Sequence, residues 1–172
     1  MRCLLDKVTA RYALQGFLKL AEGRDVNDDE LFTLDLLERA GPAQIDLFIA
    51  LSTVHILNNI ATLPKYTHLI QLFLTQVGIV FPTRYFNRWA RRLRDFNFTR
   101  EDAAILALAS FGTNDSGTIL GMHVVVTYDQ PMMRQWNLRY IRIQERFSSM
   151  THNIAIPYNQ AKLPELLRSE QI

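Results

Sequence analysis

The chain has 172 residues, of which 48% are hydrophobic and 21% are charged, and its formal net charge is +2. This is the composition of a globular protein, and the length suits one domain that buries about two thirds of the surface of its unfolded chain. The apolar runs are far shorter than a transmembrane helix, and the single cysteine, Cys3, excludes an intramolecular disulfide. Because strand-like residues begin at Arg2, we expect no signal peptide and a cytoplasmic protein without a membrane partner.

The first half of the chain alternates short apolar runs with apolar residues at helical spacing. In chain order, this pattern predicts a strand over 2–6, helices over 8–23 and 29–40, a strand over 45–51, helices over 52–60 and 66–77, and a strand over 79–81. Asn27 and Asp28 supply N-cap chemistry for the second helix. In that helix we expect four apolar side chains to face the core: Leu31, Phe32, Leu34 and Leu37.

The second half begins with a helix over 83–95 and a further helix that is capped by Thr99 and ends at Phe111. The remaining pattern predicts a loop over 112–117, a strand over 123–130, a turn or short helix over 131–136, a strand over 140–143 and a tail ending in a short helix over 164–168. This alternation predicts a three-layer α/β/α fold with a mainly parallel central sheet. We expect an α/β domain over 1–145 and a C-terminal extension or tail over 146–172.

The strand over 123–130 contains three consecutive valines and is bounded by Gly121 and Pro131. Such a short β-branched run is typical of a strand that is buried on both faces of a parallel sheet. Asp129 falls at its expected end. Ligands of open α/β sheets bind outside the carboxyl ends of the strands, so Asp129 is a candidate for chemistry.

Two other aspartates have comparable positions, because Asp6 ends the first strand and Asp102 lies in the first turn of a helix. Carboxylates that converge on one crevice can hold Mg²⁺ or Mn²⁺, and such ions catalyse phosphodiester hydrolysis. The alternative is structural, since aspartates often cap helices or end strands. Asp102 in particular is fully explained as a first-turn acid.

Three segments, taken in order, resemble the PIN-domain (PilT N-terminus-like) nucleases: Leu4-Leu5-Asp6, the run from Arg100 to Ala109, and Val124 to Asp129. The family includes the ribonuclease toxins of bacterial toxin–antitoxin pairs, and the resemblance covers residues 2 to about 143. It implies a ribonuclease that depends on Mg²⁺ or Mn²⁺, bound by Asp6, Asp102 and Asp129. Thr127 matches the threonine of the family's Thr-x-Asp motif. Because the family includes such toxins, an antitoxin or another protein is a candidate partner, although the sequence alone does not identify an antitoxin.

The chain departs from the family at two places. Lys7 follows the first acid, where the family often has Thr-Asn or a small hydroxyl residue, and it can pair with a carboxylate or contact a phosphate. The helix expected to carry the family's second acid has neither Asp nor Glu, and three neutral residues are candidates for its place: His55, Asn58 and Asn59. Neutral ligands weaken the binding of divalent ions, so an active nuclease and an inactive relative both remain open.

The helix expected over 83–95 is strongly basic on one side. Its arginines are Arg84, Arg88, Arg91 and Arg92, and its apolar side holds Phe86, Trp89, Ala90 and Leu93. The arginines can neutralise the phosphates of RNA, with Tyr85 or Trp89 close enough to stack on a base. A solvated helix face and a surface for an acidic protein partner are the alternatives.

Two hypotheses about function follow. In one, the protein is a metal-dependent ribonuclease whose basic helix steers RNA towards the aspartates. In the other, it is a non-catalytic PIN-like module that binds RNA or a protein through the same helix. The methionine-rich and aromatic segment over 128–136 is either packed in the core or forms the face of a homodimer.

Overall fold

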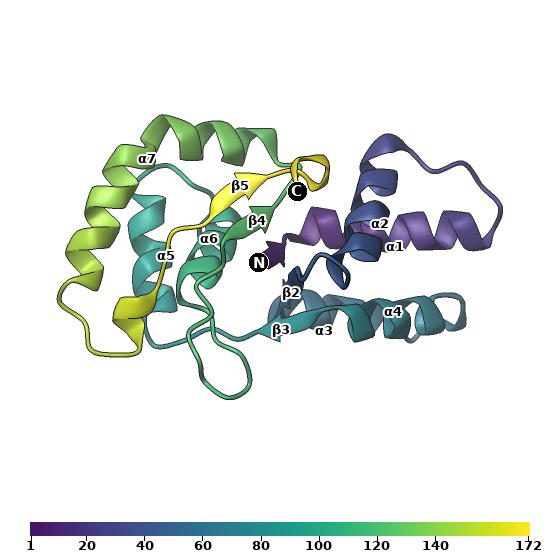
Figure 1. The fold of residues 1–172 in the computed structure, drawn as a ribbon, viewed down its shortest axis with the longest axis horizontal. Helices are drawn as coiled ribbons and strands as arrows, with labels where there is room; N and C mark the ends of the chain where they lie inside the picture. The colour runs from purple at the N-terminus through teal and green to yellow at the C-terminus, as the bar shows by residue number, and fades with distance from the viewer. The chain divides into compact units, whose positions relative to one another are not determined.

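The computed structural model describes the backbone of residues 1–172 and all side chains except that of Lys65. Over these residues the chain forms seven α-helices and five strands (Figure 1). The strands form one parallel sheet in the order β3-β2-β1-β4-β5, which confirms the expected α/β class and is consistent with a three-layer α/β/α fold. The elements are β1 (Arg2–Leu5), α1 (Lys7–Ala21), α2 (Asp28–Ala40), β2 (Asp46–Ala50), α3 (Leu51–Ile60), α4 (Pro64–Gln76), β3 (Gly78–Val80), α5 (Phe86–Arg94), α6 (Arg100–Phe111), β4 (Val124–Val126), α7 (Gln130–Thr151) and β5 (Glu165–Leu167).

The chain divides into two compact units. Unit 1 comprises Met1–Ile79, Val126–Tyr128 and Leu167–Ile172. Unit 2 comprises Val80–Val125 and Asp129–Leu166. The boundary expected at residue 145 falls inside α7. None of the described helices combines the length and the apolar character that crossing a membrane requires.

Unit 1 is built on the parallel pair of β1 and β2, whose register runs from Arg2 opposite Asp46 to Leu5 opposite Ile49. Most residues of both strands are buried, as expected for strands covered on both faces, while Phe48 in the middle of β2 is half-buried. Helices α1 and α2 pack closely where Gly16 faces Leu34, because a β-carbon on Gly16 would lie 2.8 Å from Leu34 Cδ1.

Two segments from later in the chain complete unit 1. The Thr127 amide donates to the Leu167 carbonyl at 2.9 Å. The Tyr128 hydroxyl lies 3.3 Å from the Thr33 hydroxyl, which in turn lies 3.3 Å from the Ser169 hydroxyl. Burial is the main cause of a raised pKa of Tyr128. These polar groups tie three distant parts of the sequence together inside unit 1.

Helix α2 begins at a capping box, in which Asn27 and Glu30 each accept a hydrogen bond from the other's backbone amide. Burial alone would raise the pKa of Glu30, but hydrogen bonds from the Lys19 ammonium and the Asn27 amide, together with nearby positive charge, lower it overall. This pairing allows a carboxylate to be buried on the inner side of the helix.

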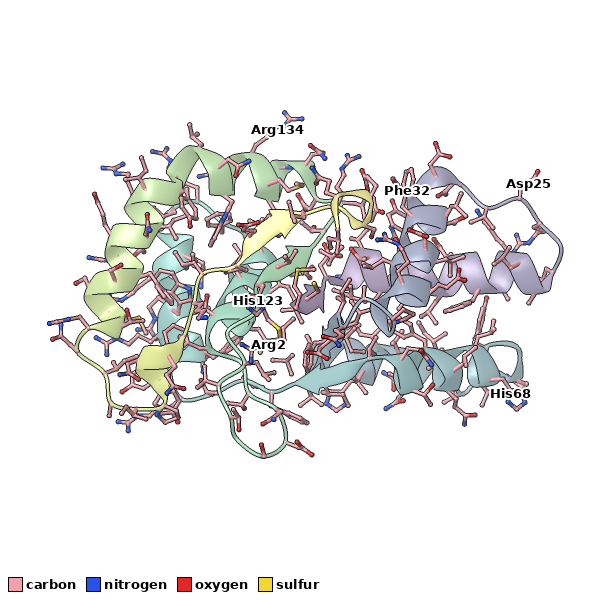
Figure 2. All side chains as sticks on the ribbon, in the orientation of Figure 1. Arg2, Asp25, Phe32, His68, His123 and Arg134 are labelled. Carbon is pink, nitrogen blue, oxygen red and sulfur yellow. The ribbon has the colours of Figure 1, made fainter. Side chains whose placement is uncertain are left out.

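The expectation that Leu31 and Phe32 face the core is wrong. Their side chains are 54% and 38% exposed (Figure 2). The inner face of α2 instead contains two polar residues that have partners, Glu30 and Thr33. Sequence periodicity assigns polar residues to the outside, so it rotates the predicted inner face towards Leu31.

Unit 2 has its own core, in which α5 packs against α6. Trp89 and Phe111 are fully buried, and the Trp89 and Phe147 rings meet edge to face with centroids 5.1 Å apart. Thr99 caps α6 as expected, in a second capping box with Asp102. Helix α5 is shorter than expected: it begins at Phe86 and not at residue 83, and it ends at Arg94.

Helix α7 replaces the turn and the strand that were expected over 131–143. Asp129 caps this helix and Pro131 lies in its first turn, where proline needs no amide donor. Its buried side chains follow a helical period: Met132, Trp136, Ile143, Phe147 and Met150. The large residues at 140–143 look like a strand when this segment is read alone. Over 132–150, however, the buried apolar residues recur with the period of a helix. Met132 and Trp136 are buried, which confirms that the methionine-rich and aromatic segment over 128–136 packs in the core.

The C-terminal segment forms a strand, β5, and the helix expected over 164–168 is wrong. The Glu165 amide donates to the His123 carbonyl at 2.8 Å. Pro164 immediately precedes β5, which is the last strand in the sheet order. Proline is tolerated at the start of an edge strand and equally in the first turn of a helix, so Pro164 does not decide between the two. The pairing with the segment at His123 gives this segment its strand conformation.

Candidate functional site

Asp6 is the most constrained of the predicted site residues. It follows β1 directly and caps α1, where its Oδ1 accepts a hydrogen bond from the Thr9 amide at 2.6 Å. Its Oδ2 accepts a hydrogen bond from the Thr127 hydroxyl at 2.5 Å. The Asp6 side chain is 7% exposed and Thr127 is fully buried. The structure therefore brings these two predicted residues together in unit 1 and fixes the plane of the carboxylate.

Backbone pairing holds this arrangement in place. The Asp6 amide donates to the Val126 carbonyl at 3.1 Å, and the Thr9 hydroxyl donates to the same carbonyl at 2.9 Å. Since Thr127 follows Val126 directly, these bonds fix the backbone that carries the threonine. Asp6 and Thr9, about 120 positions before Thr127 in the sequence, thus hold the Thr127 hydroxyl in place beside the Asp6 carboxylate.

Asp102 and Asp129 are both N-terminal helix residues of unit 2. Asp102 accepts from the Thr99 amide at 3.4 Å, and its own amide donates to the Thr99 hydroxyl at 3.1 Å. Asp129 caps α7, and its Oδ1 accepts from the Met132 amide at 2.8 Å. Both side chains are half-buried. Each carboxylate thus accepts a hydrogen bond from a backbone amide at the N-terminal end of a helix.

The three predicted metal ligands are divided between the units, with Asp6 in unit 1 and Asp102 and Asp129 in unit 2. Among the side chains that the structure describes, no group of three or more histidines, cysteines or acids is arranged to hold a metal ion. The donors themselves are hard carboxylate oxygens, which suit Mg²⁺ and Mn²⁺.

The residues proposed for the place of the second acid lie on α3. His55, Asn58 and Asn59 are all exposed on this helix. The helix begins at Leu51 and has no side-chain cap, and both hydroxyl residues, Ser52 and Thr53, lie inside it. Lys7 is the first residue of α1 and is exposed next to Asp6 in the sequence.

The basic face of unit 2 is defined here as Arg88, Arg91 and Arg92 of α5 together with Arg146 of α7. The pKa of Arg92 is lowered, mainly by desolvation and then by the positive charges of Arg146 and Arg88, with Asp95 opposing the shift. Among the described side chains, none of the four arginines of the basic face forms an ion pair. Like charges are therefore held close together, with Asp95 as the opposing negative charge.

Two features of this face differ from the sequence prediction. Trp89 is fully buried, so the prediction that it stacks on a base is wrong. Tyr85 is half-buried, because its ring meets that of Tyr158 at 4.8 Å between centroids and it also contacts Phe111. Arg84 precedes α5, and its guanidinium lies 5.7 Å from the Tyr85 ring centre.

Arg146 was missed because the sequence pattern ended a strand at residue 143 and assigned the following residues to a tail. The signal that would have revealed it is the helical period from Met132 to Met150, which carries α7 past the arginine. Once α7 is recognised as continuous, Arg146 belongs to a helix of unit 2 and no longer to a polar tail.

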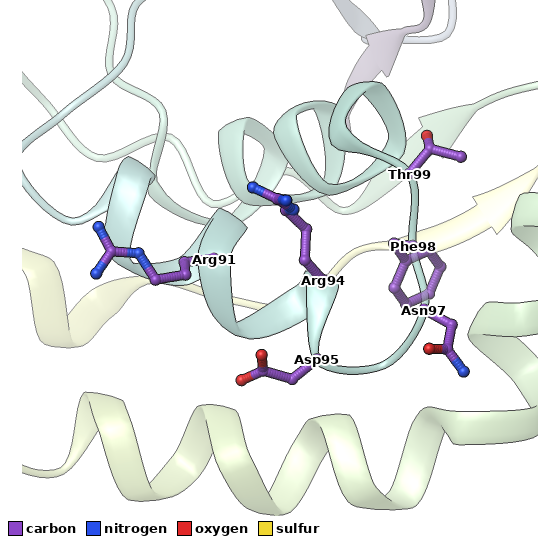
Figure 3. A pocket seen from close by; sticks show the side chains of 6 residues that line it. All are labelled: Arg91, Arg94, Asp95, Asn97, Phe98 and Thr99. Atoms are coloured by element: carbon purple, nitrogen blue, oxygen red, sulfur yellow. The ribbon is translucent and has the colours of Figure 1, made fainter.

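An open pocket of about 640 Å³ lies at the C-terminal end of α5 and the connection to α6 (Figure 3). Its lining residues are Arg91, Arg94, Asp95, Asn97, Phe98 and Thr99. Asn97 has a positive φ of 66°, a conformation that asparagine tolerates better than most residues, and it turns the chain between the two helices. The pocket joins the basic face through Arg91.

Comparison of the chain with protein-family models, with curated proteins and with solved structures gives no match.

Proposed function

We propose that the protein binds RNA through the phosphate groups that contact the basic face of unit 2. The observation that carries this proposal is the position of Arg92, whose pKa is lowered mainly by burial and further by the nearby positive charges of Arg146 and Arg88. Holding these charges together is unfavourable in the unbound protein. A polyanion relieves their repulsion and releases its own counterions on binding.

The basic face favours contact with the backbone over recognition of bases. Guanidinium groups bind phosphate oxygens in a bidentate manner. The aromatic side chains nearest to the arginines are packed against other rings, and Trp89 has no exposed surface. Binding of this kind carries little sequence information and depends strongly on salt.

The proposal is tested by the fluorescence anisotropy of a labelled single-stranded RNA, titrated with protein at several salt concentrations. Arg88→Glu should weaken binding by about tenfold at low salt and reduce the salt dependence, because phosphate contacts are lost. The matched control is Arg11→Glu, which makes the same change of charge at an exposed position of α1 in unit 1. Unchanged affinity in the double variant Arg88→Glu/Arg92→Glu contradicts the proposal.

Metal-dependent cleavage of RNA is a second candidate function, and the geometry of Asp6 favours it. A buried carboxylate held by Thr127 beyond a parallel strand is preorganised, as a ligand of Mg²⁺ or Mn²⁺ must be. The resemblance of the aspartate motifs to the PIN-domain nucleases points to the same reaction. Asp102 and Asp129 are the further ligands in this candidate mechanism.

The cleavage assay uses purified protein, RNA and Mn²⁺, with Asp6→Asn and Asp129→Asn as variants. Asparagine also caps helices, so the variants should keep the fold while losing the negative charge that binds the cation. We expect cleavage to fall by about 100-fold or more in each variant. Equal cleavage by wild type and variants excludes this candidate, and binding of RNA without cleavage leaves the non-catalytic RNA-binding function.

A further inference from the structure

Two helices expose a stripe of large apolar residues between charged ones, and the charges have opposite signs. The acidic stripe of α2 consists of Asp28, Leu31, Phe32, Asp35 and Glu38. The arginine stripe of α7 consists of Arg134, Leu138, Ile141 and Arg142, and one acid, Glu145, lies on the same side of the helix one turn later. Figure 2 shows Arg134 directed away from α7. Spacings of three and four residues place the members of each stripe on one side of its helix.

The apolar side chains at the centre of each stripe are unusually exposed. Leu138 and Ile141 are 73% and 71% exposed, and Leu31 is 54% exposed. On both helices the opposite face is fully occupied, by Leu36 and Ala40 on α2 and by Ile143 and Phe147 on α7. Each helix therefore has one face in a core and a second apolar strip that is largely exposed.

The charges around these strips are mostly not neutralised within the chain. Asp28 and Glu38 form no ion pair with any described side chain, and neither do Arg134 and Arg142. Asp35 pairs with Arg39 on the same helix at 2.7 Å, but both partners are about half exposed. Such an exposed pair contributes little and exchanges readily.

We propose that the acidic stripe of one copy of this chain docks on the arginine stripe of a second copy. Leu31 and Phe32 would pack on Leu138 and Ile141 while the acids meet the arginines. The occupant is a second copy because the chain itself supplies both complementary surfaces, and because the stripes have similar lengths of about 15 Å and about 12 Å. An interface between two different surfaces either closes into a ring or continues as a chain of molecules.

The experiment is sedimentation velocity from about 1 to about 200 μM protein, a range that detects weak association. Two charge-reversed variants are prepared, Arg134→Glu/Arg142→Glu on α7 and Asp35→Lys/Glu38→Lys on α2. Each variant alone brings like charges together, so we expect its association to weaken by about tenfold or more. Circular dichroism verifies that both remain folded, as expected for changes on exposed helix surfaces.

The decisive sample is an equimolar mixture of the two variants. The unchanged acidic stripe of the α7 variant meets the unchanged arginine stripe of the α2 variant, and the two reversed stripes also complement each other. Association should therefore return to the wild-type level in the mixture. A wild type that is monomeric throughout the range, a mixture that stays monomeric, or a variant that associates as the wild type does would each overturn the proposal.

Discussion

Replacing Asp6 with alanine should lower the free energy of unfolding by about 2–4 kcal/mol, measured by urea denaturation. Loss of the cap of α1 accounts for about 1 kcal/mol. Removal of the buried acceptor of the Thr127 hydroxyl adds about 1–3 kcal/mol, since a buried donor that loses its partner costs the desolvation of the polar group.

Two variants separate these contributions. Asp6→Asn keeps an oxygen for the Thr9 amide and a polar group towards Thr127, so its cost should be about 1 kcal/mol or less. Asp102→Ala also removes a capping-box acid, but its side chain is half-buried and its expected cost is about 1 kcal/mol. A cost of Asp6→Ala no greater than that of Asp102→Ala would show that the bond to Thr127 contributes nothing.

Replacing Gly112 with alanine should destabilise the protein by about 3 kcal/mol or more. A β-carbon at this position would lie 2.2 Å from Val80 Cγ1 and 2.4 Å from the Leu108 carbonyl oxygen. The oxygen belongs to the backbone of α6, so the clash is relieved only by moving the helix end or β3, and overpacking of this kind is costly.

Gly41→Ala provides the matched control for Gly112→Ala. Gly41 also ends a helix, α2, but it has φ −60° and no atom within 4 Å of the added carbon. This substitution should be neutral or stabilise by about 0.5 kcal/mol, because alanine restricts the unfolded chain. Equal stability of the two variants, measured by thermal or urea unfolding, would contradict the packing described for Gly112.

Local signals explain which elements the sequence predicts well. Asn27 with Glu30 and Thr99 with Asp102 form capping boxes, and both helices begin where these residues predict. The three valines of β4 are buried as expected for a strand covered on both faces. In each case the information lies within a few neighbouring residues, so it can be read without knowledge of the fold.

The errors concern information that is not local. Glu30 is buried because it pairs with Lys19 from another helix. With Glu30 on the inner face of α2, the neighbouring Leu31 points outwards. The strand conformation of β5 depends on pairing with the segment at His123, about forty residues earlier. Hydrophobic pattern alone cannot supply such contacts.

The same limit applies to the candidate site. Asp6 and Asp129 were identified from their positions at the ends of strands, and Thr127 from the resemblance of its motif to the PIN-domain nucleases. The structure adds that Thr127 supports Asp6. Arg146 was not predicted, because its closeness to Arg92 depends on how α5 and α7 fold within unit 2. The burial of Trp89 likewise follows from the packing of Phe147 from α7.

Unit 1 is built from segments at both ends of the chain, and this determines when it can fold during synthesis. Asp6 and Thr127 are 121 residues apart, and Thr33 and Ser169 are 136 residues apart. Closing such long loops is slow and costs chain entropy before the contacts are gained. Unit 2 is nearly continuous in sequence, so it can assemble from its own neighbouring segments. We therefore expect unit 1 to wait, with Asp6 unsupported by Thr127, until most of the chain has left the ribosome.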